Sequence, residues 1–241
     1  MRLLLAFLLL LLPGCDEPRI QSFAPAIPTT LKSQGRRISV AVQMPERIQP
    51  RLPAIILLPG RAGLGFYGDQ VNQLAKRLNS RGYVAVIPQY LGRSPGEVPE
   101  QVDRQTFELW QHTVADIVGF AERLPSVDRT KIGIAAFSLG AFVSSVQAAS
   151  DPRIAALAIN SAGLSDHFPQ KVRKMPPTLI IHARNDPIVP LAQAEALLAR
   201  SRRSGGDARL LIIEGNEHIA SGGSWLQSME AMVRFFDTSL R

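Results

Sequence analysis

The chain has 241 residues, of which 46% are hydrophobic and 20% are charged. This apolar content excludes an intrinsically disordered chain, and the length suffices for one large domain with a sizeable core. Lysine and arginine outnumber aspartate and glutamate by 27 to 20, which gives a formal net charge of +7 at pH 7. Because the basic residues are spread along the chain without a recognition motif, we expect no nucleic-acid partner.

The N-terminal residues have the layout of an export signal. Arg2 precedes an apolar run, Leu3–Leu12, which is too short to cross a bilayer as a helix. The only cysteine, Cys15, follows, so neither an internal disulfide nor a cysteine-based zinc site is possible. The segment resembles a bacterial lipoprotein signal. The resemblance implies cleavage before Cys15, lipidation of Cys15, and an exported protein anchored to a membrane of the cell envelope, facing the periplasm or the exterior. The alternative is an ordinary signal peptide with an incidental cysteine.

The next segment is predicted to be a tether. Residues 16–35 are rich in proline, serine, threonine and glutamine and have no hydrophobic periodicity. We therefore divide the chain into a signal peptide over residues 1–14, a lipid-anchor cysteine with its tether over residues 15–35, and one folded domain over residues 36–241.

Short apolar runs and helical patterns alternate through that domain. Near-continuous apolar runs are typical of parallel strands that are covered on both faces. Six such runs are predicted to be strands: Ala54–Leu58, Tyr83–Ile87, Ile132–Phe137, Ile154–Ile159, Thr178–Ala183 and Ala208–Glu214. Arg36–Met44 alternates more and is predicted to be an antiparallel edge strand. The runs are separated by helical patterns, so we expect a mostly parallel, doubly wound α/β sheet flanked by helices.

One strand end carries a candidate nucleophile. Ser138 directly follows the run that ends at Phe137, and a helical pattern follows the serine. Ala136 and Gly140 flank Ser138 at a distance of two residues, where a tight strand-to-helix turn needs small side chains. This pattern is typical of a nucleophile elbow, although alanine replaces the usual first glycine. Read alone, the serine could equally be the N-cap of a helix.

Two further strand ends carry a candidate acid and base. Asp186 follows Thr178–Ala183, and His218 follows the last predicted strand. A serine hydroxyl needs an imidazole to take its proton and a carboxylate to orient that imidazole. The order Ser138, Asp186, His218 is that of α/β-hydrolases. Asp166 is the alternative acid, while His112, His167 and His182 lie in a helical pattern, a loop and a strand.

The strand end at Leu58 opens a glycine-rich loop. In a fold of this kind, this loop supplies one backbone amide to an oxyanion hole, and the residue after the nucleophile supplies the other. We therefore predict that the amides of Arg61 and Leu139 form the oxyanion hole. A flexible glycine turn without a catalytic role is the alternative.

Four stretches of the chain resemble the dienelactone hydrolase family of α/β-hydrolases: LLPGRAGLGFYGDQVNQLAKRLNSRGYVAVIPQYLGR, KIGIAAFSLGA, IIHARNDPIVP and EGNEH. The resemblance covers roughly residues 36–240 and implies an α/β-hydrolase fold without a large lid, which hydrolyses esters or lactones. Two positions depart from the family. Ser138 stands where the type enzyme has a cysteine nucleophile, and Gly60 stands where it has a glutamate.

We therefore expect a serine hydrolase that cleaves small-molecule carboxylic esters, with lactones and thioesters as further candidate substrates. The alternatives are a peptidase or thioesterase with the same triad, and a non-catalytic, membrane-tethered binding protein on the same scaffold. No cofactor and no metal are expected, because the histidines are isolated from one another. The sequence leaves the oligomeric state open. Candidates for lining the substrate pocket are Leu64, Phe66, Tyr67, Tyr90 and Leu164.

Overall fold

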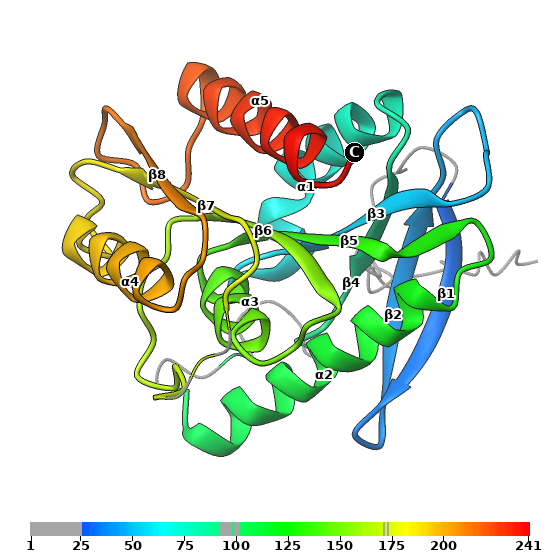
Figure 1. Cartoon of the computed structure of the whole chain (residues 1–241), viewed down its shortest axis with the longest axis horizontal. Helices are drawn as coiled ribbons and strands as arrows, with labels where there is room; N and C mark the ends of the chain where they lie inside the picture. The colour runs from blue at the N-terminus through cyan, green and yellow to red at the C-terminus, as the bar shows by residue number, and fades with distance from the viewer. Residues whose placement is uncertain (1–25, 92–97, 99–101, 171, 173) are drawn as a thin grey trace, which may run out of the picture.

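The computed structural model describes residues 26–91, 98, 102–170, 172 and 174–241. Eight strands form one sheet in the order β1-β2-β4-β3-β5-β6-β7-β8, with helices on both faces (Figure 1). The strands β1 and β2 run antiparallel to their neighbours, and β3 to β8 pair in parallel. The strand bounds are β1 Ala26–Ser33, β2 Arg36–Gln43, β3 Leu52–Leu58, β4 Val84–Pro88, β5 Val127–Phe137, β6 Ile154–Asn160, β7 Thr178–Ala183 and β8 Ala208–Ile213. This arrangement confirms the predicted α/β-hydrolase fold.

The central strands are buried on both faces, as their continuous apolar runs predict. Every residue of β4 and β7 is buried. Along β3, Ile55 and Leu57 belong to one apolar core, whereas Ile56 and Leu58 belong to the other. Successive side chains of a strand point to opposite faces, so each central strand contributes to two cores at once. The six predicted parallel strands are confirmed, but β5 starts at Val127, well before the predicted Ile132.

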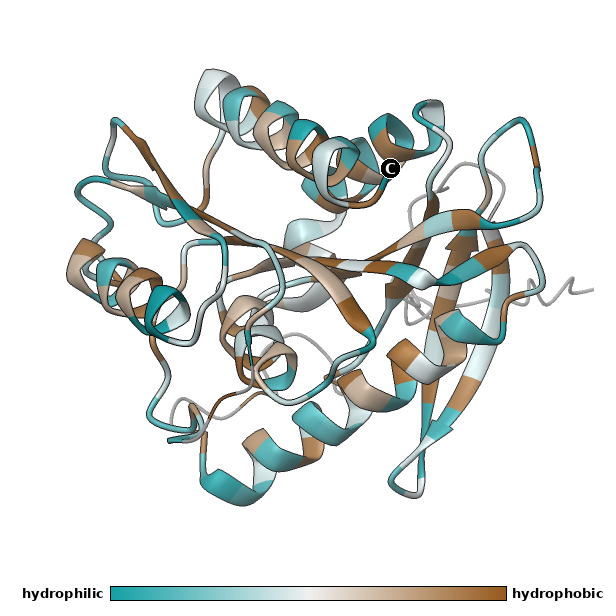
Figure 2. Ribbon diagram, in the orientation of Figure 1, coloured by the Kyte–Doolittle hydropathy of each residue, from teal (hydrophilic) through white to brown (hydrophobic). Residues whose placement is uncertain are grey.

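Two helices cover one face of the sheet and three cover the other (Figure 1). The helices α1, Gly63–Ser80, and α5, Gly222–Ser239, lie together on one face. The helices α2, Arg104–Glu122, α3, Leu139–Ala148, and α4, Leu191–Arg203, lie on the other face. Brown, apolar stripes alternate with teal, polar stripes around these helices in Figure 2, as amphipathic helices on a buried sheet require.

The N-terminal edge of the sheet corrects two predictions. Residues 26–33 form β1, which pairs with β2 from Ala26 opposite Gln43 to Ser33 opposite Arg36. The tether prediction is therefore wrong for residues 26–33, and β2 is not the edge strand, although it is antiparallel as predicted. The strand β1 gave little hydrophobic signal because it is an outer strand with many exposed positions, including Ile27 at 61% exposure.

The predicted export signal lies outside the described residues. Residues 1–25, which include Cys15 and the start of the tether, are not among those that the structure describes. Residues 92–97 and 99–101, between β4 and α2, fall outside them as well. Among the described residues, no helix combines the length and apolar character that crossing a bilayer requires.

Candidate active site

Ser138 occupies a strained turn between β5 and α3. Its backbone has φ 47° and ψ −119°, in a region that non-glycine residues rarely adopt. The Ser138 amide donates to the carbonyl oxygen of Asn160 at 2.9 Å, which ties the turn to the end of β6. A Cβ atom at Gly140 would lie 2.5 Å from the carbonyl oxygen of Pro59, so only glycine fits there. Ala136 is fully buried in β5. The sequence pattern around the serine therefore forms the sharp turn that it predicted.

Asp186 lies in the loop after β7 with its side chain fully buried. The carboxylate Oδ1 accepts hydrogen bonds from the amides of Ile188 at 2.8 Å and Val189 at 2.9 Å. Burial by itself would raise the pKa of Asp186. The hydrogen bonds from Val189, Ile188 and His218 together outweigh burial, and the pKa of the carboxyl lies below its ordinary value. Asp186 is thus held ionised in a fixed orientation.

His218 lies between the acid and the serine. Its Nδ1 is 2.8 Å from Oδ2 of Asp186, and its Nε2 is 2.8 Å from Oγ of Ser138. The Ser161 hydroxyl donates to the carbonyl oxygen of His218 and thereby holds the loop that carries the ring. The structure thus brings together the three residues that the sequence singled out. The acid that meets His218 is Asp186 rather than the alternative, Asp166.

A second histidine supports the acid loop, in a role that no local sequence pattern indicates. His182 is fully buried near the end of β7, and its Nε2 lies 2.8 Å from the carbonyl oxygen of Val189. That distance means that Nε2 carries the hydrogen and donates it. Since the amide of Val189 binds Asp186, His182 holds the same loop residue from the other side. The same Nε2 is 3.7 Å from Oδ2 of Asp186.

The predicted oxyanion loop lies against the start of α3. Arg61 follows Gly60 in the connection between β3 and α1, and Leu139 is the first residue of α3. The amides of a first helical turn have no acceptor within their own helix. The close approach of Gly140 to the carbonyl oxygens of Leu58 and Pro59 shows that the end of β3 touches the turn of Ser138. Arg61 and Leu139 therefore come from two segments in direct contact.

Two tyrosines pack against the oxyanion loop. Tyr90 is fully buried, and its hydroxyl donates to the carbonyl oxygen of Pro59 at 3.1 Å. It therefore supports the loop, and the prediction that Tyr90 lines the substrate pocket is wrong. Tyr67 is 4% exposed, and its hydroxyl lies near the Ser138 side chain. A Cβ atom at Gly60 would lie 2.3 Å from the Tyr67 hydroxyl, so this hydroxyl occupies the space that a side chain at residue 60 would need.

The described residues contain no group of three or more histidine, cysteine, aspartate or glutamate side chains that could hold a metal ion. The polar groups at this site form a hydrogen-bonded chain. It runs from the Ser138 hydroxyl through the His218 imidazole to the Asp186 carboxylate, which accepts from two backbone amides. Such a chain can move one proton between the serine and the histidine while the carboxylate stays ionised.

The chain is similar to known proteins in sequence and in fold. The sequence profile described as the dienelactone hydrolase family matches residues 38–220, which is more than half of the chain. No curated protein sequence matches the chain significantly.

Solved structures with the same fold cover most of the chain. A dienelactone hydrolase-like promiscuous phosphotriesterase from metagenomic libraries has a TM-score of 0.77 at 17% identity, over 90% of this chain and 98% of its own. Dienelactone hydrolase from Anabaena variabilis ATCC 29413 has a TM-score of 0.72 at 16% identity, over 90% and 98%. Est1E from Butyrivibrio proteoclasticus has a TM-score of 0.69 at 18% identity, over 88% and 98%. At these low sequence identities, the structural similarity supports a shared fold and nothing more.

Proposed function

The chain belongs to the dienelactone hydrolase family of hydrolases, and from this premise we propose that it is a serine hydrolase that cleaves carboxylic esters through an acyl-enzyme. The observation that carries the proposal is the continuous chain of contacts from Ser138 through His218 to Asp186. The serine in place of the cysteine of the type enzyme favours a serine esterase over a dienelactone-specific enzyme.

The first half of the reaction forms the acyl-enzyme. Ser138 Oγ attacks the ester carbonyl carbon while its proton moves to Nε2 of His218, and the carbonyl oxygen becomes an oxyanion. The backbone amides of Arg61 and Leu139 donate to that oxygen. Collapse of the tetrahedral intermediate breaks the bond to the leaving oxygen, which takes the proton from Nε2 and departs as an alcohol.

The second half repeats these steps with water. His218 takes a proton from water, the hydroxide attacks the acyl carbon, and collapse returns the proton to Oγ of Ser138 and releases the acid. Asp186 stays ionised throughout. It keeps the Nδ1 hydrogen of His218 in place and stabilises the imidazolium that forms in each half. The amides of Ile188 and Val189 hold the carboxylate without adding a cation that would compete for its charge.

The direct test is Ser138→Ala in the purified protein, assayed with p-nitrophenyl acetate and p-nitrophenyl butyrate. Removing the nucleophile is expected to lower kcat by on the order of 10⁴- to 10⁶-fold. A matched control is Ser150→Ala, which removes a serine hydroxyl beyond the other end of α3, where it donates to Gln147. Activity that survives in Ser138→Ala would sink the proposal. Competition among an ester, a thioester and a peptide substrate then separates an esterase from a thioesterase or peptidase.

We also propose that the protein is exported and anchored to a membrane of the cell envelope through a lipid on Cys15. The support is the sequence of residues 1–15 alone, with its apolar run and single cysteine. The test is radiolabelling of the full chain with a fatty acid in a bacterial host. Label is expected on the wild type and not on Cys15→Ala, which should also leave the membrane fraction. Equal labelling of both proteins would contradict the anchor.

A further inference from the structure

Tyr67 is a buried side chain near Ser138 that takes no part in the proposed reaction steps. It lies in the second turn of α1, and its ring packs against Phe66, at a centroid distance of 5.1 Å, and Phe137, at 6.1 Å. Phe137 directly precedes Ser138, so the ring is fixed by the same segment that carries the nucleophile. The phenolic hydroxyl lies near the Ser138 side chain.

The same hydroxyl touches the oxyanion loop. A Cβ atom at Gly60 would meet the Tyr67 hydroxyl oxygen at 2.3 Å and the ring carbon Cζ at 2.6 Å, both impossibly close for a larger residue. Gly60 directly precedes Arg61, whose amide we place in the oxyanion hole. The Tyr67 hydroxyl therefore packs against the loop that faces the developing oxyanion and lies near the nucleophile.

The chemistry of the buried phenol suits a hydrogen-bond donor. Burial raises the pKa of Tyr67 to about 12, even though the nearby Ser138 side chain lowers it. The phenol therefore keeps its hydrogen at neutral pH and can donate it without becoming a competing anion. Tyr90 supports the loop from another side through Pro59, so the backbone against which Tyr67 lies is fixed as well.

We infer that Tyr67 is a further catalytic residue, whose hydroxyl donates a hydrogen bond on the oxyanion side of Ser138. The inference rests on the proposed function. In the resting enzyme, Oγ of Ser138 donates its hydrogen to His218, with the Tyr67 hydroxyl close by. When Oγ forms the bond to the substrate carbon, the Tyr67 hydroxyl donates to the new oxyanion, beside the amides of Arg61 and Leu139. The proton stays on Tyr67 throughout, so no group gains or loses charge in this step.

The test is Tyr67→Phe, which keeps the ring and removes only the hydroxyl. Loss of one oxyanion donor lowers kcat by on the order of 10²-fold, and we expect this loss with little change in KM for p-nitrophenyl acetate. The chain offers a matched control in Tyr83→Phe, which removes a phenolic hydroxyl that bonds Asp237 at 3.0 Å, remote from Ser138. We expect Tyr83→Phe to keep the wild-type kcat. A kcat for Tyr67→Phe equal to that of the wild type would overturn the inference.

A second readout separates an oxyanion donor from a merely structural residue. A trifluoromethyl ketone adds to Ser138 and forms a stable oxyanion, so its affinity reports the oxyanion hole directly. We expect Tyr67→Phe to weaken this inhibitor by the same factor by which it lowers kcat/KM. A lower kcat with unchanged inhibitor affinity would overturn the oxyanion role, because the loss would then come from the position of Ser138 alone.

The Ser138→Ala variant and a fluorinated tyrosine at position 67 distinguish failure of this inference from failure of the proposed function. If the wild type hydrolyses the ester and Ser138→Ala does not, an unaltered Tyr67→Phe overturns only this inference, whereas activity in Ser138→Ala overturns the proposed function. Should Tyr67→Phe fail to fold by circular dichroism, 3-fluorotyrosine at position 67 keeps the hydroxyl and makes it a stronger donor. That variant is expected to bind the trifluoromethyl ketone more tightly, and unchanged affinity would overturn the inference.

Discussion

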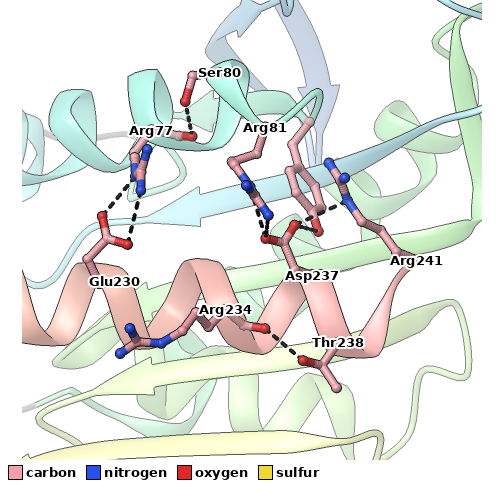
Figure 3. Close-up of polar contacts among 9 residues, drawn as sticks. Arg77, Ser80, Arg81, Glu230, Arg234, Asp237, Thr238 and Arg241 are labelled. Carbon is pink, nitrogen blue, oxygen red and sulfur yellow. Dashed lines mark hydrogen bonds and ion pairs between the residues drawn. The ribbon is translucent and has the colours of Figure 1, made fainter.

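Two aspartates of this protein are each held by several donors, and their partners differ in kind. Asp186 is fully buried and accepts from two backbone amides and one imidazole. Asp237, on α5, is 17% exposed and is bound by Arg81, Arg241 and the Tyr83 hydroxyl. Figure 3 shows the guanidinium groups of Arg81 and Arg241 converging on Asp237.

The difference in partners separates catalysis from stability. Amides orient the Asp186 carboxylate without neutralising it, so its charge remains available to an imidazolium that forms on His218. The guanidinium groups around Asp237 compensate its charge permanently and join the loop after α1 to the end of α5. We therefore expect substitutions at Asp186 to change activity strongly and those at Asp237 to change only stability.

The largest effect is expected for Asp186→Asn. The asparagine can still accept from the amides of Ile188 and Val189, but its NH₂ group would face Nδ1 of His218 and favour the wrong tautomer. We expect kcat to fall by about 10³- to 10⁴-fold, measured with p-nitrophenyl acetate. Asp237→Asn is the matched control and should keep the wild-type kcat. A fall of less than tenfold in Asp186→Asn would mean that the carboxylate charge is not used.

The pH dependence of stability should also distinguish Asp186. Its pKa is lowered in the folded protein, so its contribution to the free energy of unfolding is complete above the unfolded pKa and is lost as the pH falls through the folded value. The wild type should therefore lose more stability than Asp186→Asn as the pH falls below about 4. Urea unfolding at several pH values measures the difference between the two curves. The other carboxylates cancel in this difference, and parallel curves would contradict the prediction.

Both of these predictions concern Asp186, which could be predicted as the acid from the sequence. The strands, the turn at Ser138 and the loops of Asp186 and His218 could be predicted because apolar runs and small-residue spacing are local signals. Parallel strands place their carboxyl ends at one edge of the sheet, so local signals sufficed to predict a common site. The strand β1 could not be predicted, because an outer strand with exposed side chains has no apolar run.

The roles of His182 and Tyr67 could not be predicted for a different reason. His182 looked like a core histidine because it lies within an apolar strand, and nothing local indicates that it donates to Val189. Tyr67 was a candidate only for lining a pocket. Its position near Phe137 and Ser138 depends on how α1 packs on the sheet, and its approach to Gly60 depends on the course of the oxyanion loop. Both contacts join segments far apart in the chain, so only the tertiary structure shows them.

A smaller effect is expected for the stability of Asp237→Asn. The substitution weakens the ion pairs with Arg81 and Arg241, while the amide can still bond the Tyr83 hydroxyl. For partly exposed ion pairs we expect a loss of about 1 kcal/mol in the free energy of unfolding. In a protein of this size, that corresponds to a Tm lower by about 2–4 °C. Calorimetry measures the shift, and an unchanged Tm would show that this cluster does not join α1 to α5 energetically.

The smallest effect is expected for Glu230→Gln. Glu230 lies on α5, like Asp237, and binds Arg77 of α1. Arg77 donates from Nε at 2.8 Å and from its terminal nitrogen at 3.2 Å to the two oxygens of Glu230, and both side chains are substantially exposed (Figure 3). The hydrogen bond from Arg77 lowers the pKa of Glu230, so the carboxylate is ionised at neutral pH. The Debye length, beyond which salt largely screens the interaction of exposed charges, is about 30 Å at 0.01 M salt and about 3 Å at 1 M. The Tm of Glu230→Gln should therefore lie slightly below that of the wild type at 0.01 M salt and match it at 1 M. A difference that persisted at 1 M salt would place Glu230 with the buried carboxylates, because it would then act through geometry that salt does not screen.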